Sequence, residues 1–239
     1  MAAIKWLRPR LRSRGVTFTG IPPAAFEFYE RLQLDNSRTF WLANKKIYEA
    51  EVKGSIEDLL DELTSRYPKR GPFHIFRPYR DVRFAKDKTP YKENIGALGE
   101  SEGGAGYYVH LNASGMFAGS GYYHMASDQL ERFRTAVDAE TTGAVLAKRL
   151  AEVTKAGFQV GAMDELKTAP RGYAKDHPRV EILRRKGLFV GKEWPRAKWM
   201  STKAVADRVG QAWDAGNPVN AWLDKHVGPS TLPPDEHRR

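Results

Sequence analysis

The fold is decided by the stretch Tyr107-Tyr-Val-His-Leu-Asn-Ala-Ser-Gly-Met-Phe-Ala-Gly-Ser-Gly-Tyr-Tyr-His-Met125. Its two halves, Tyr107–Leu111 and Met116–Met125, predict neighbouring strands, and the turn residues between them predict a β-hairpin. Upstream, Phe73–Phe84 predicts another strand, in which Pro78 indicates a free edge or a bulge because proline donates no ladder hydrogen bond. Between these strands, Ala85–Ala105 predicts a long, charged, glycine-rich connection, and connections of that length are usually functional or mobile.

Helical patterns flank these strands on both sides. A predicted helix over Ala24–Leu34 follows Pro22-Pro23, and Asp35-Asn36-Ser37 ends it and offers an N-cap to a second helix from about Arg38 to Tyr67, with a kink at Gly54. The later elements that we expect are a helical region opened by Asp128 with Glu131, reaching about Ala156 and broken at Thr141-Thr-Gly143, short helices near Pro178–Arg185 and Thr202–Ala215, and a short strand at Leu188–Val190. The sequence therefore predicts an α+β fold, in which N-terminal helices precede a central, mainly antiparallel sheet with further helices packed on it.

The composition is that of one globular domain. The 239 residues are 41% hydrophobic and 28% charged, and a chain of this length can form a single compact unit. We expect a basic flexible tail over residues 1–17, one α+β domain over residues 18–228 and a C-terminal tail over residues 229–239. Because Met1–Arg14 lacks apolar periodicity and repels itself, its deletion is expected to leave folding intact.

Several classes of protein and of site are excluded or disfavoured. The chain has no cysteine, which excludes disulfides, thiolate metal sites and cysteine nucleophiles. No apolar run is long enough to cross a bilayer and the first residues lack a signal-peptide pattern, so we expect a cytoplasmic protein without a membrane partner. The six histidines show no metal-ligand spacing, and Gly99-Glu-Ser-Glu-Gly103 lies outside the strand-to-helix context of a nucleophile elbow. We expect no metal and no cofactor.

The formal net charge is +10, and the positive charge is unevenly distributed. It is concentrated in Met1–Arg14, Arg66–Lys92 and Lys167–Lys203, so the remainder of the chain is net acidic. Concentrated positive charge raises the local concentration of anions more than an even distribution does. The pattern favours one localised anion site over a uniform polycationic surface.

The most informative of these regions is the stretch Arg77-Pro-Tyr-Arg-Asp-Val-Arg-Phe-Ala-Lys-Asp-Lys-Thr-Pro-Tyr-Lys92. Bases packed so closely need acidic partners or a bound anion, and arginine and lysine suit phosphate and carboxylate. The two aspartates could orient the arginines or act as acid–base groups. The structural alternative is an ion-pair network that fastens the strand and the loop. The candidate ligand-binding residues here are Arg77, Arg80, Asp81, Arg83, Lys86, Asp87, Lys88, Tyr91 and Lys92.

Strand alternation assigns different roles within this first cluster. In an extended strand, Arg77, Tyr79, Asp81 and Arg83 share one face, and the more apolar opposite face should pack on the core. The polar face is therefore expected to point toward a cleft. Arg80 falls on the core face, so we expect it to be buried and paired with a carboxylate, and its replacement to be strongly destabilising.

A second cluster lies in Lys167–Lys186. Its segment Ala169-Pro-Arg-Gly-Tyr173 has the residues of a fixed turn, and it carries Arg171. His177 is a candidate proton carrier near neutral pH, with a loop histidine hydrogen-bonded to the backbone as the alternative. Arg171 and His177 complete the candidate ligand-binding set. Because each cluster is too charge-rich to pack alone, we expect at least one side chain of Arg77–Lys92 to lie within salt-bridge distance of one in Lys167–Lys186.

Spaced motifs run through most of the chain. They are Phe26…Leu32…Asn36-Ser37-Arg38…Trp41…Asn44-Lys45…Tyr48, then Arg77…Arg80-Asp-Val-Arg-Phe…Lys86-Asp-Lys-Thr-Pro-Tyr-Lys92, Gly106-Tyr-Tyr-Val…Leu111, Gly119…Gly121, Leu130…Arg134, Ala169-Pro-Arg-Gly-Tyr and Asp176-His-Pro. Over roughly residues 18–226 the sequence resembles the bacterial and fungal family called domain of unknown function 2461. The resemblance implies an α+β fold and a shared polar cluster, and it implies no known activity, substrate or cofactor, so no catalytic residue is carried over. Asp35 stands where the family pattern implies a second asparagine.

Three functions are compatible with these patterns. The leading hypothesis is a site that binds, or acts on, a small anionic ligand bearing phosphate or carboxylate. The second is a nucleic-acid-binding module that uses the same basic surface and the N-terminal tail, although the acidic remainder of the chain repels a long polyanion and no nucleic-acid motif is present. The third is a structural or interaction protein whose charge clusters are ion-pair networks. Whether the chain is an enzyme stays open at this point.

Overall fold

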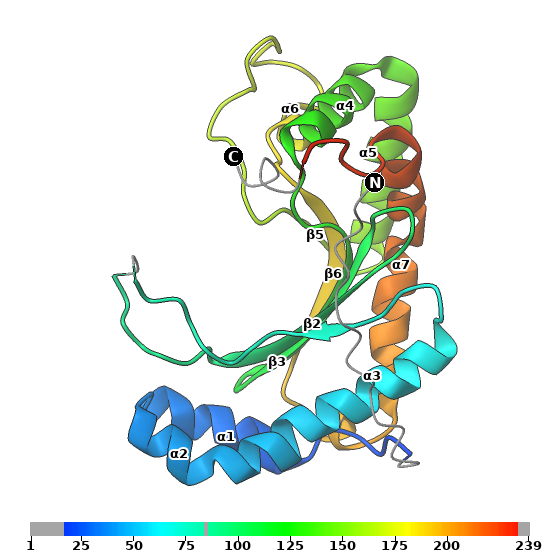
Figure 1. The fold of residues 1–239 in the computed structure, drawn as a ribbon. Coiled ribbons are helices and arrows are strands. Elements are labelled where there is room, and N and C mark those ends of the chain that lie inside the picture. The colour runs from blue at the N-terminus through cyan, green and yellow to red at the C-terminus, as the bar shows by residue number, and fades with distance from the viewer. Residues whose placement is uncertain (1–16, 84–85, 234–239) are drawn as a thin grey trace.

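The computed structural model describes residues 17–83 and 86–233. The strands are β1 (His74–Ile75), β2 (Asn94–Glu100), β3 (Gly106–Asn112), β4 (Gly115–Tyr122), β5 (Gln159–Gly161) and β6 (Leu188–Pro195). The helices are α1 (Pro23–Leu34), α2 (Arg38–Ile47), the π-helix η1 (Tyr48–Lys53), α3 (Gly54–Arg66), α4 (Ser127–Asp138), α5 (Glu140–Lys155), α6 (Val180–Leu183), the 3-10 helix η2 (Lys198–Ser201) and α7 (Ala204–His226). The strands form one antiparallel sheet in the order β1-β2-β3-β4-β6-β5, which confirms the α+β class with N-terminal helices (Figure 1).

The predicted hairpin forms the centre of this sheet. β3 and β4 pair along their whole length and are joined by a tight turn. At the turn, the side-chain Oδ1 of Asn112 accepts hydrogen bonds from the backbone N–H groups of Ser114 and Gly115, at 2.9 and 3.0 Å. Along β3 alternate side chains are buried on one face, as the period of a strand requires. These buried residues are Tyr107, Val109 and Leu111.

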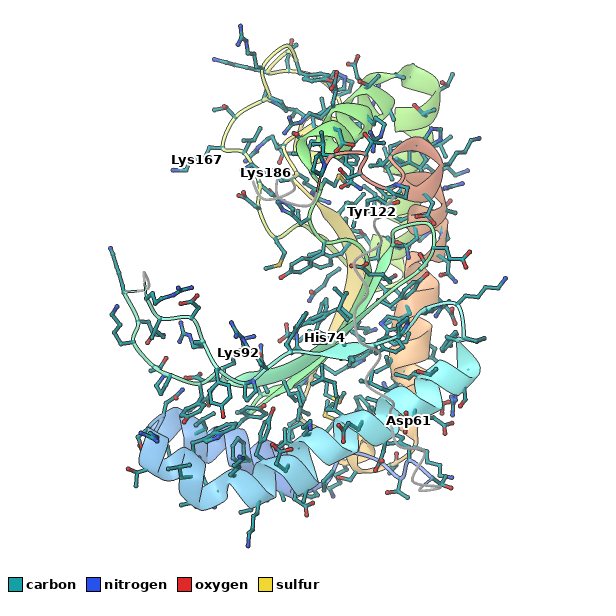
Figure 2. The ribbon with its side chains drawn as sticks, in the orientation of Figure 1. Asp61, His74, Lys92, Tyr122, Lys167 and Lys186 are labelled. Atoms are coloured by element: carbon teal, nitrogen blue, oxygen red, sulfur yellow. The ribbon has the colours of Figure 1, made fainter. Side chains whose placement is uncertain are left out.

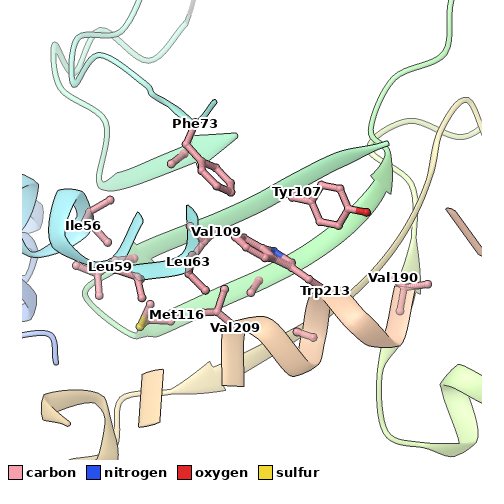
Figure 3. Close-up of a cluster of buried hydrophobic side chains, with 14 of the residues drawn as sticks. Ile56, Leu59, Leu63, Phe73, Tyr107, Val109, Met116, Val190, Val209 and Trp213 are labelled. Atoms are coloured by element: carbon pink, nitrogen blue, oxygen red, sulfur yellow. The ribbon is translucent and has the colours of Figure 1, made fainter. Parts of the chain in front are cut away.

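The core lies on the face of the sheet that carries Tyr107 and Val109, where α3 and α7 cover the strands (Figure 3). Trp213 of α7 is fully buried there. Its ring stacks on that of Phe73 with centroids 5.4 Å apart and meets Tyr107 edge-on at 5.7 Å, and its Nε1 donates to the backbone oxygen of Tyr108 at 2.9 Å. The helices cover this face, and they leave the other face of the central strands uncovered (Figure 1).

The other face of the sheet is concave and open (Figure 1). Two long connections project on that side from opposite ends of the sheet: the loop of residues 76–93 between β1 and β2, and the loop of residues 162–179 between β5 and α6. These loops contain most of the two basic clusters. The fold therefore places both clusters around one concave surface.

The strand predicted over Phe73–Phe84 was wrong beyond its first residues. Only β1 pairs with β2, and after Pro78 the chain folds back on itself. The backbone N–H of Arg80 donates to Pro90 at 2.9 Å, and that of Lys92 donates to Pro78 at 2.8 Å. Pro78 has no N–H to continue the ladder, so the segment forms an irregular loop.

The connection predicted over Ala85–Ala105 was also wrong, because it contains β2. This strand carries Ile95, Ala97 and Gly99 toward the core and Asn94, Gly96 and Leu98 toward the concave face. Small residues and glycines are unfavourable in strands, so the composition of residues 94–100 does not predict a strand. Pairing with β1 and β3 on its two sides decides the outcome.

The helical predictions hold with shifted details. The second helix is continuous from Arg38 to Arg66, and its predicted kink is the π-helix η1, in which the N–H of Gly54 bonds to the carbonyl of Glu49, five residues back. The helical region after Ser127 divides at Ala139, earlier than predicted. Asp128 does not form a box with Glu131, since its carboxylate accepts from Ser230 and Thr231 instead. Both α7 and β6 extend beyond the predicted short elements, because they pack along β4.

The predicted tail over residues 1–17 lies outside the described residues up to residue 16. Of the predicted C-terminal tail, residues 229–233 are described, and Ser230 and Thr231 are hydrogen-bonded to α4.

Candidate functional site

A pocket of about 320 Å³ lies on the concave face of the sheet. The glycines Gly106, Gly119 and Gly121 form part of its base, and Tyr123 and Met163 stand at its mouth with roughly half of their surface exposed. Exposed apolar side chains around a concavity are characteristic of ligand-binding sites. The other lining residues are Asn94, Leu98, Tyr108, His110, Phe117, Ser120 and Phe189.

Aromatic rings lie across glycines of the neighbouring strands on this face. A Cβ atom at Gly96 would lie 2.7 Å from the Oη of Tyr108, and one at Gly161 would lie 2.6 Å from the Cζ of Phe189. Gly191 in the same way leaves room for Phe117, whose Cζ occupies the place that a side chain there would need. Because each ring covers a residue without a side chain, it lies against the sheet and turns its other side toward the pocket.

The titratable groups of the pocket are uncharged at neutral pH. Burial lowers the pKa of His110 to about 4, so its imidazole is neutral and offers one donor and one acceptor. Burial, and to a smaller extent Tyr123, raise the pKa of Tyr108 to about 12. The ring of His110 stacks on that of Phe117 with centroids 5.5 Å apart. The pocket is therefore a neutral, aromatic surface with a few polar groups.

Two cations lie at one border of this surface. The Nζ of Lys92 is 5.5 Å from the centre of the Phe76 ring, and that ring is 6.3 Å from the ring of Tyr108. Partial burial, and then the charge of Arg77, lower the pKa of Lys92, so the two cations are near each other. Figure 2 shows Lys92 on the concave side of the sheet. Within residues 17–83 and 86–233, neither side chain makes an ion pair or a hydrogen bond, and Arg77 contributes only a minor part of the lowered pKa of Asp81.

The position of Lys92 is set by its neighbour Tyr91. Tyr91 is buried, and its ring stacks on that of Trp41 with centroids 4.2 Å apart. The side chain of Asn36 holds the backbone of Tyr91 at both of its polar groups, donating to the carbonyl at 3.0 Å and accepting from the N–H at 3.2 Å. Asn36 follows α1 and Trp41 lies in α2, so the N-terminal helices anchor the base of the loop and hold Lys92 at the edge of the pocket.

The tip of the loop, in contrast, forms pairs within itself. Arg80 binds the carboxylate of Asp87 and the hydroxyl of Thr89. Hydrogen bonds from the backbone and side chain of Thr89 and from Arg80 hold the pKa of Asp87 at about 2. Arg80 thus has the predicted carboxylate partner but is not buried as predicted: 32% of its side chain is exposed, because the loop leaves the sheet before residue 80.

The remaining tip residues follow the same pattern. Arg83 binds Asp81 through Nε at 3.0 Å and Nη2 at 2.7 Å, and these hydrogen bonds lower the pKa of Asp81. The Nζ of Lys88 donates to the carbonyl of Val82 at 2.9 Å. Lys86 is exposed. The predicted common face of Arg77, Tyr79, Asp81 and Arg83 is wrong, since no strand exists there and Tyr79 packs beside Trp41 and Tyr91.

The second cluster faces the pocket from the opposite side but does not reach the first. Among the described residues, no ion pair joins residues 77–92 to residues 167–186, so the predicted salt bridge between the clusters is wrong. The bases of the second cluster are paired locally: Arg184 with Glu181, Arg185 with Glu165, and Lys186 with Asp164 at 2.6 Å. Both clusters can pack separately because each contains, or has close by, its own carboxylates.

The two candidate residues of the second cluster differ in their surroundings. His177 is nearly buried; its Nε2 lies 3.2 Å from Asp138, and its Nδ1 accepts from the backbone N–H of Arg179 at 3.0 Å. His177 thus has the backbone hydrogen bond of the alternative interpretation and, in addition, a neighbouring carboxylate. Arg171 is exposed on the loop.

The pocket-lining side chains were missed by the sequence prediction. Their signal is a strand face on which aromatic residues alternate with glycines, where a solvated face would carry polar residues. The pattern occurs in Gly106, Tyr108 and His110, in Phe117, Gly119 and Gly121, and in Phe189 and Gly191.

Within residues 17–83 and 86–233, no group of three or more histidine, aspartate or glutamate residues is arranged to hold a metal ion. Among the helices of the same residues, none is both long and apolar enough to span a bilayer.

Comparison with known proteins identifies one family. The model of the family described as conserved hypothetical protein (DUF2461) matches residues 24–222, a range that includes the sheet, the pocket and both basic clusters. No curated protein matches the chain.

Proposed function

The chain belongs to the DUF2461 family, and we propose that it binds a small phosphate- or carboxylate-bearing ligand in the pocket on the concave face, with Lys92 and Arg77 as the anion-binding cations. One observation carries this proposal: two neighbouring cations that form no ion pair with any described residue lie beside a pocket lined by neutral groups. Like charges repel most where solvent is partly excluded. A bound anion would remove that repulsion, and arginine and lysine are the side chains that bind phosphate and carboxylate.

The pairing of the other bases supports the choice of these two. Arg80, Arg83 and Lys88 already bind groups of their own loop, so an anion would have to displace a partner. We therefore assign them, with Asp81 and Asp87, to the shape of the loop. Lys86 and Arg171 are exposed and would add long-range attraction. Tyr91 and His177 would act as positioning residues that hold the borders of the pocket.

The proposal is tested by thermal shift and calorimetric titration with a panel of phosphate- and carboxylate-bearing metabolites. A ligand present at about 100 times its Kd stabilises the folded state by about 2.7 kcal/mol, which a melting curve detects. We expect Lys92→Gln and Arg77→Gln each to weaken binding about tenfold or more, since each removes a charged hydrogen-bond donor.

Lys192→Gln is the matched control. The Nζ of Lys192 also lies over a phenylalanine ring, 5.2 Å from the centre of Phe158, but on the other face of the sheet. Wild-type affinity of Lys92→Gln, or no stabilisation of the wild type by any anion of the panel, would contradict the proposal. A small anion gives a shallow dependence of affinity on salt, whereas a nucleic-acid-binding module, the alternative function, gives a steep one.

A further inference from the structure

The floor of the pocket carries two aromatic rings. Tyr108 and Phe117 lie across Gly96 and Gly191 of the neighbouring strands, their ring centroids are 6.2 Å apart, and their planes are inclined at 48° to each other. Neither ring is fully buried, although both lie in the interior of the sheet. Rings held against a sheet by glycines present a π-face rather than an edge, and a π-face binds another flat ring by stacking.

Polar groups at the rim of this floor have no protein partner. Asn94, His110 and Tyr108 line the pocket, and their side chains make no hydrogen bond with any residue of the described ranges. Together they offer amide and imidazole donors and acceptors and a hydroxyl group. A hydrocarbon ring would leave these groups unpaired, whereas a heteroaromatic ring with ring nitrogens, carbonyl and amino groups can pair with them.

The anion-binding cations lie beside the floor rather than above it. The ammonium of Lys92 is over the ring of Phe76, which is next to Tyr108. A ligand that used both features would therefore carry its anionic group to one side of a flat ring. The volume of about 320 Å³ is in the range of pockets for one small molecule.

We propose, on the basis of the function proposed above, that the ligand is a nucleotide whose base stacks on the ring of Tyr108, with Phe117 beside it, and whose phosphate binds Lys92 and Arg77. The base edge pairs with Asn94 and His110. A free mononucleotide and one nucleotide of a single strand share this chemistry. The single-stranded source would use the open concave face and the basic loops at its two ends, as sheets with aromatic platforms do.

The test compares four probes on the full chain by calorimetry: the nucleoside 5′-monophosphates, ribose 5-phosphate, the free nucleosides, and a single-stranded oligonucleotide of about ten nucleotides. We expect at least one monophosphate to bind about tenfold or more tightly than ribose 5-phosphate, because stacking contributes on that scale. Tyr108→Leu should remove this difference and leave the affinity for ribose 5-phosphate unchanged. Lys92→Gln should weaken every phosphate-bearing probe and leave nucleoside binding unchanged.

Two further variants serve as a second test of stacking and as a control. Tyr123→Leu changes a half-exposed ring at the mouth of the pocket, 6.4 Å from Tyr108, and so it reports on stacking even if Tyr108→Leu fails to fold. Tyr79→Leu changes an equally exposed tyrosine outside the pocket, and it should bind like the wild type.

The outcomes separate the two proposals. Equal affinity for ribose 5-phosphate and every monophosphate would overturn the nucleotide assignment and leave the anion site standing. Absence of binding by all phosphate-bearing probes would overturn both. An oligonucleotide that binds far more tightly than the monophosphates, with a steep salt dependence, would support base stacking at this floor but overturn the small-ligand function in favour of the nucleic-acid-binding alternative.

Discussion

At the residue scale, two arginines differ in what they bind: Arg179 binds backbone oxygens of a distant segment, whereas Arg80 binds side chains of its own loop. Only 9% of the Arg179 side chain is exposed. It donates to the backbone oxygens of Val137 and Asp138 at 2.7 and 2.8 Å and to Glu140 at 2.9 Å. Arg80 binds partners within its own exposed loop. Because solvent screens exposed ion pairs, we expect the contacts of Arg179, which join two segments of the chain, to contribute more to stability than those of Arg80.

We expect Arg179→Ala to lower the free energy of unfolding by about 2–3 kcal/mol, because two backbone carbonyls at the junction of α4 and α5 lose their charged donor. Arg80→Ala should change stability far less, in contrast to the large loss that strand alternation predicted. Denaturant unfolding of both variants and the wild type measures the difference. Equal losses would mean that the loop network is as important for folding as the junction.

His110 makes the stability of the folded protein depend on pH. Burial lowers the pKa of His110 to about 4, whereas an unfolded imidazole has a pKa of about 6.5. Between these values the unfolded chain binds a proton that the folded chain does not, so this contribution to stability is complete above about pH 6.5 and is lost as the pH falls toward 4. His110→Phe should therefore lose about 2–3 kcal/mol less than the wild type between pH 7 and pH 4.5. Unfolding free energies at the two pH values decide this, and identical losses would contradict it.

At the scale of elements, the first two turns of α4 hold the C-terminus of α7 and the segment that follows it. The side chain of Gln129 donates to the carbonyl of Gly228 at 2.8 Å, and Arg132 donates to that of Val227 at 2.6 Å. The carboxylate of Asp128 accepts from the hydroxyl of Ser230 at 2.8 Å and from the N–H of Thr231 at 2.9 Å. Three side chains of one helix thus fix the C-terminus of α7 and the segment after it.

Asp128→Asn should lower the free energy of unfolding by about 1–2 kcal/mol. Burial alone would raise the pKa of Asp128, but hydrogen bonds from Thr231, Ser230 and Arg132 outweigh it and hold this pKa well below its usual range. The contribution is therefore present above about pH 4, the pKa of an unfolded aspartate, and is lost on further acidification. Asp35→Asn, the same change at an exposed carboxylate, should be neutral. Similar unfolding curves for both variants would contradict the proposed role.

At the scale of the whole molecule, the segment before α1 joins the single core. Phe18 and Ile21 are 2% and 0% exposed, and the N–H of Ile21 donates to the carbonyl of Met200 at 2.7 Å. Gly20 has φ +129° and lies against the backbone of Ser201 so closely that no side chain would fit. We therefore expect the sequence from Phe18 onward to be needed for a stable fold.

Deletion of residues 1–21 should lower the free energy of unfolding by about 3–5 kcal/mol, because it removes two fully buried side chains. Deletion of Met1–Arg14 is expected to leave the melting temperature nearly unchanged, as its composition predicts. Ile21→Ala, compared with Leu34→Ala at a position that is 88% exposed, isolates the packing contribution. A stable protein without residues 1–21 would show that this segment does not contribute to the core.

The sequence by itself determined the α+β class, the central hairpin, the first helices and the family, because periodicity, caps and turn residues are local signals. Only the tertiary structure decided that Asn94–Glu100 is a strand, that Pro78–Lys92 is a loop, and that Arg77 and Lys92 lack the carboxylates that bind their neighbours. Residues 94–100 form a strand because strands on both sides hydrogen-bond to their backbone, and no local sequence pattern predicts that pairing. The sequence shows which residues are basic, but the tertiary structure sets the distance from each base to the nearest carboxylate. For that reason composition predicted an anion site, and the arrangement of side chains was needed to propose its residues.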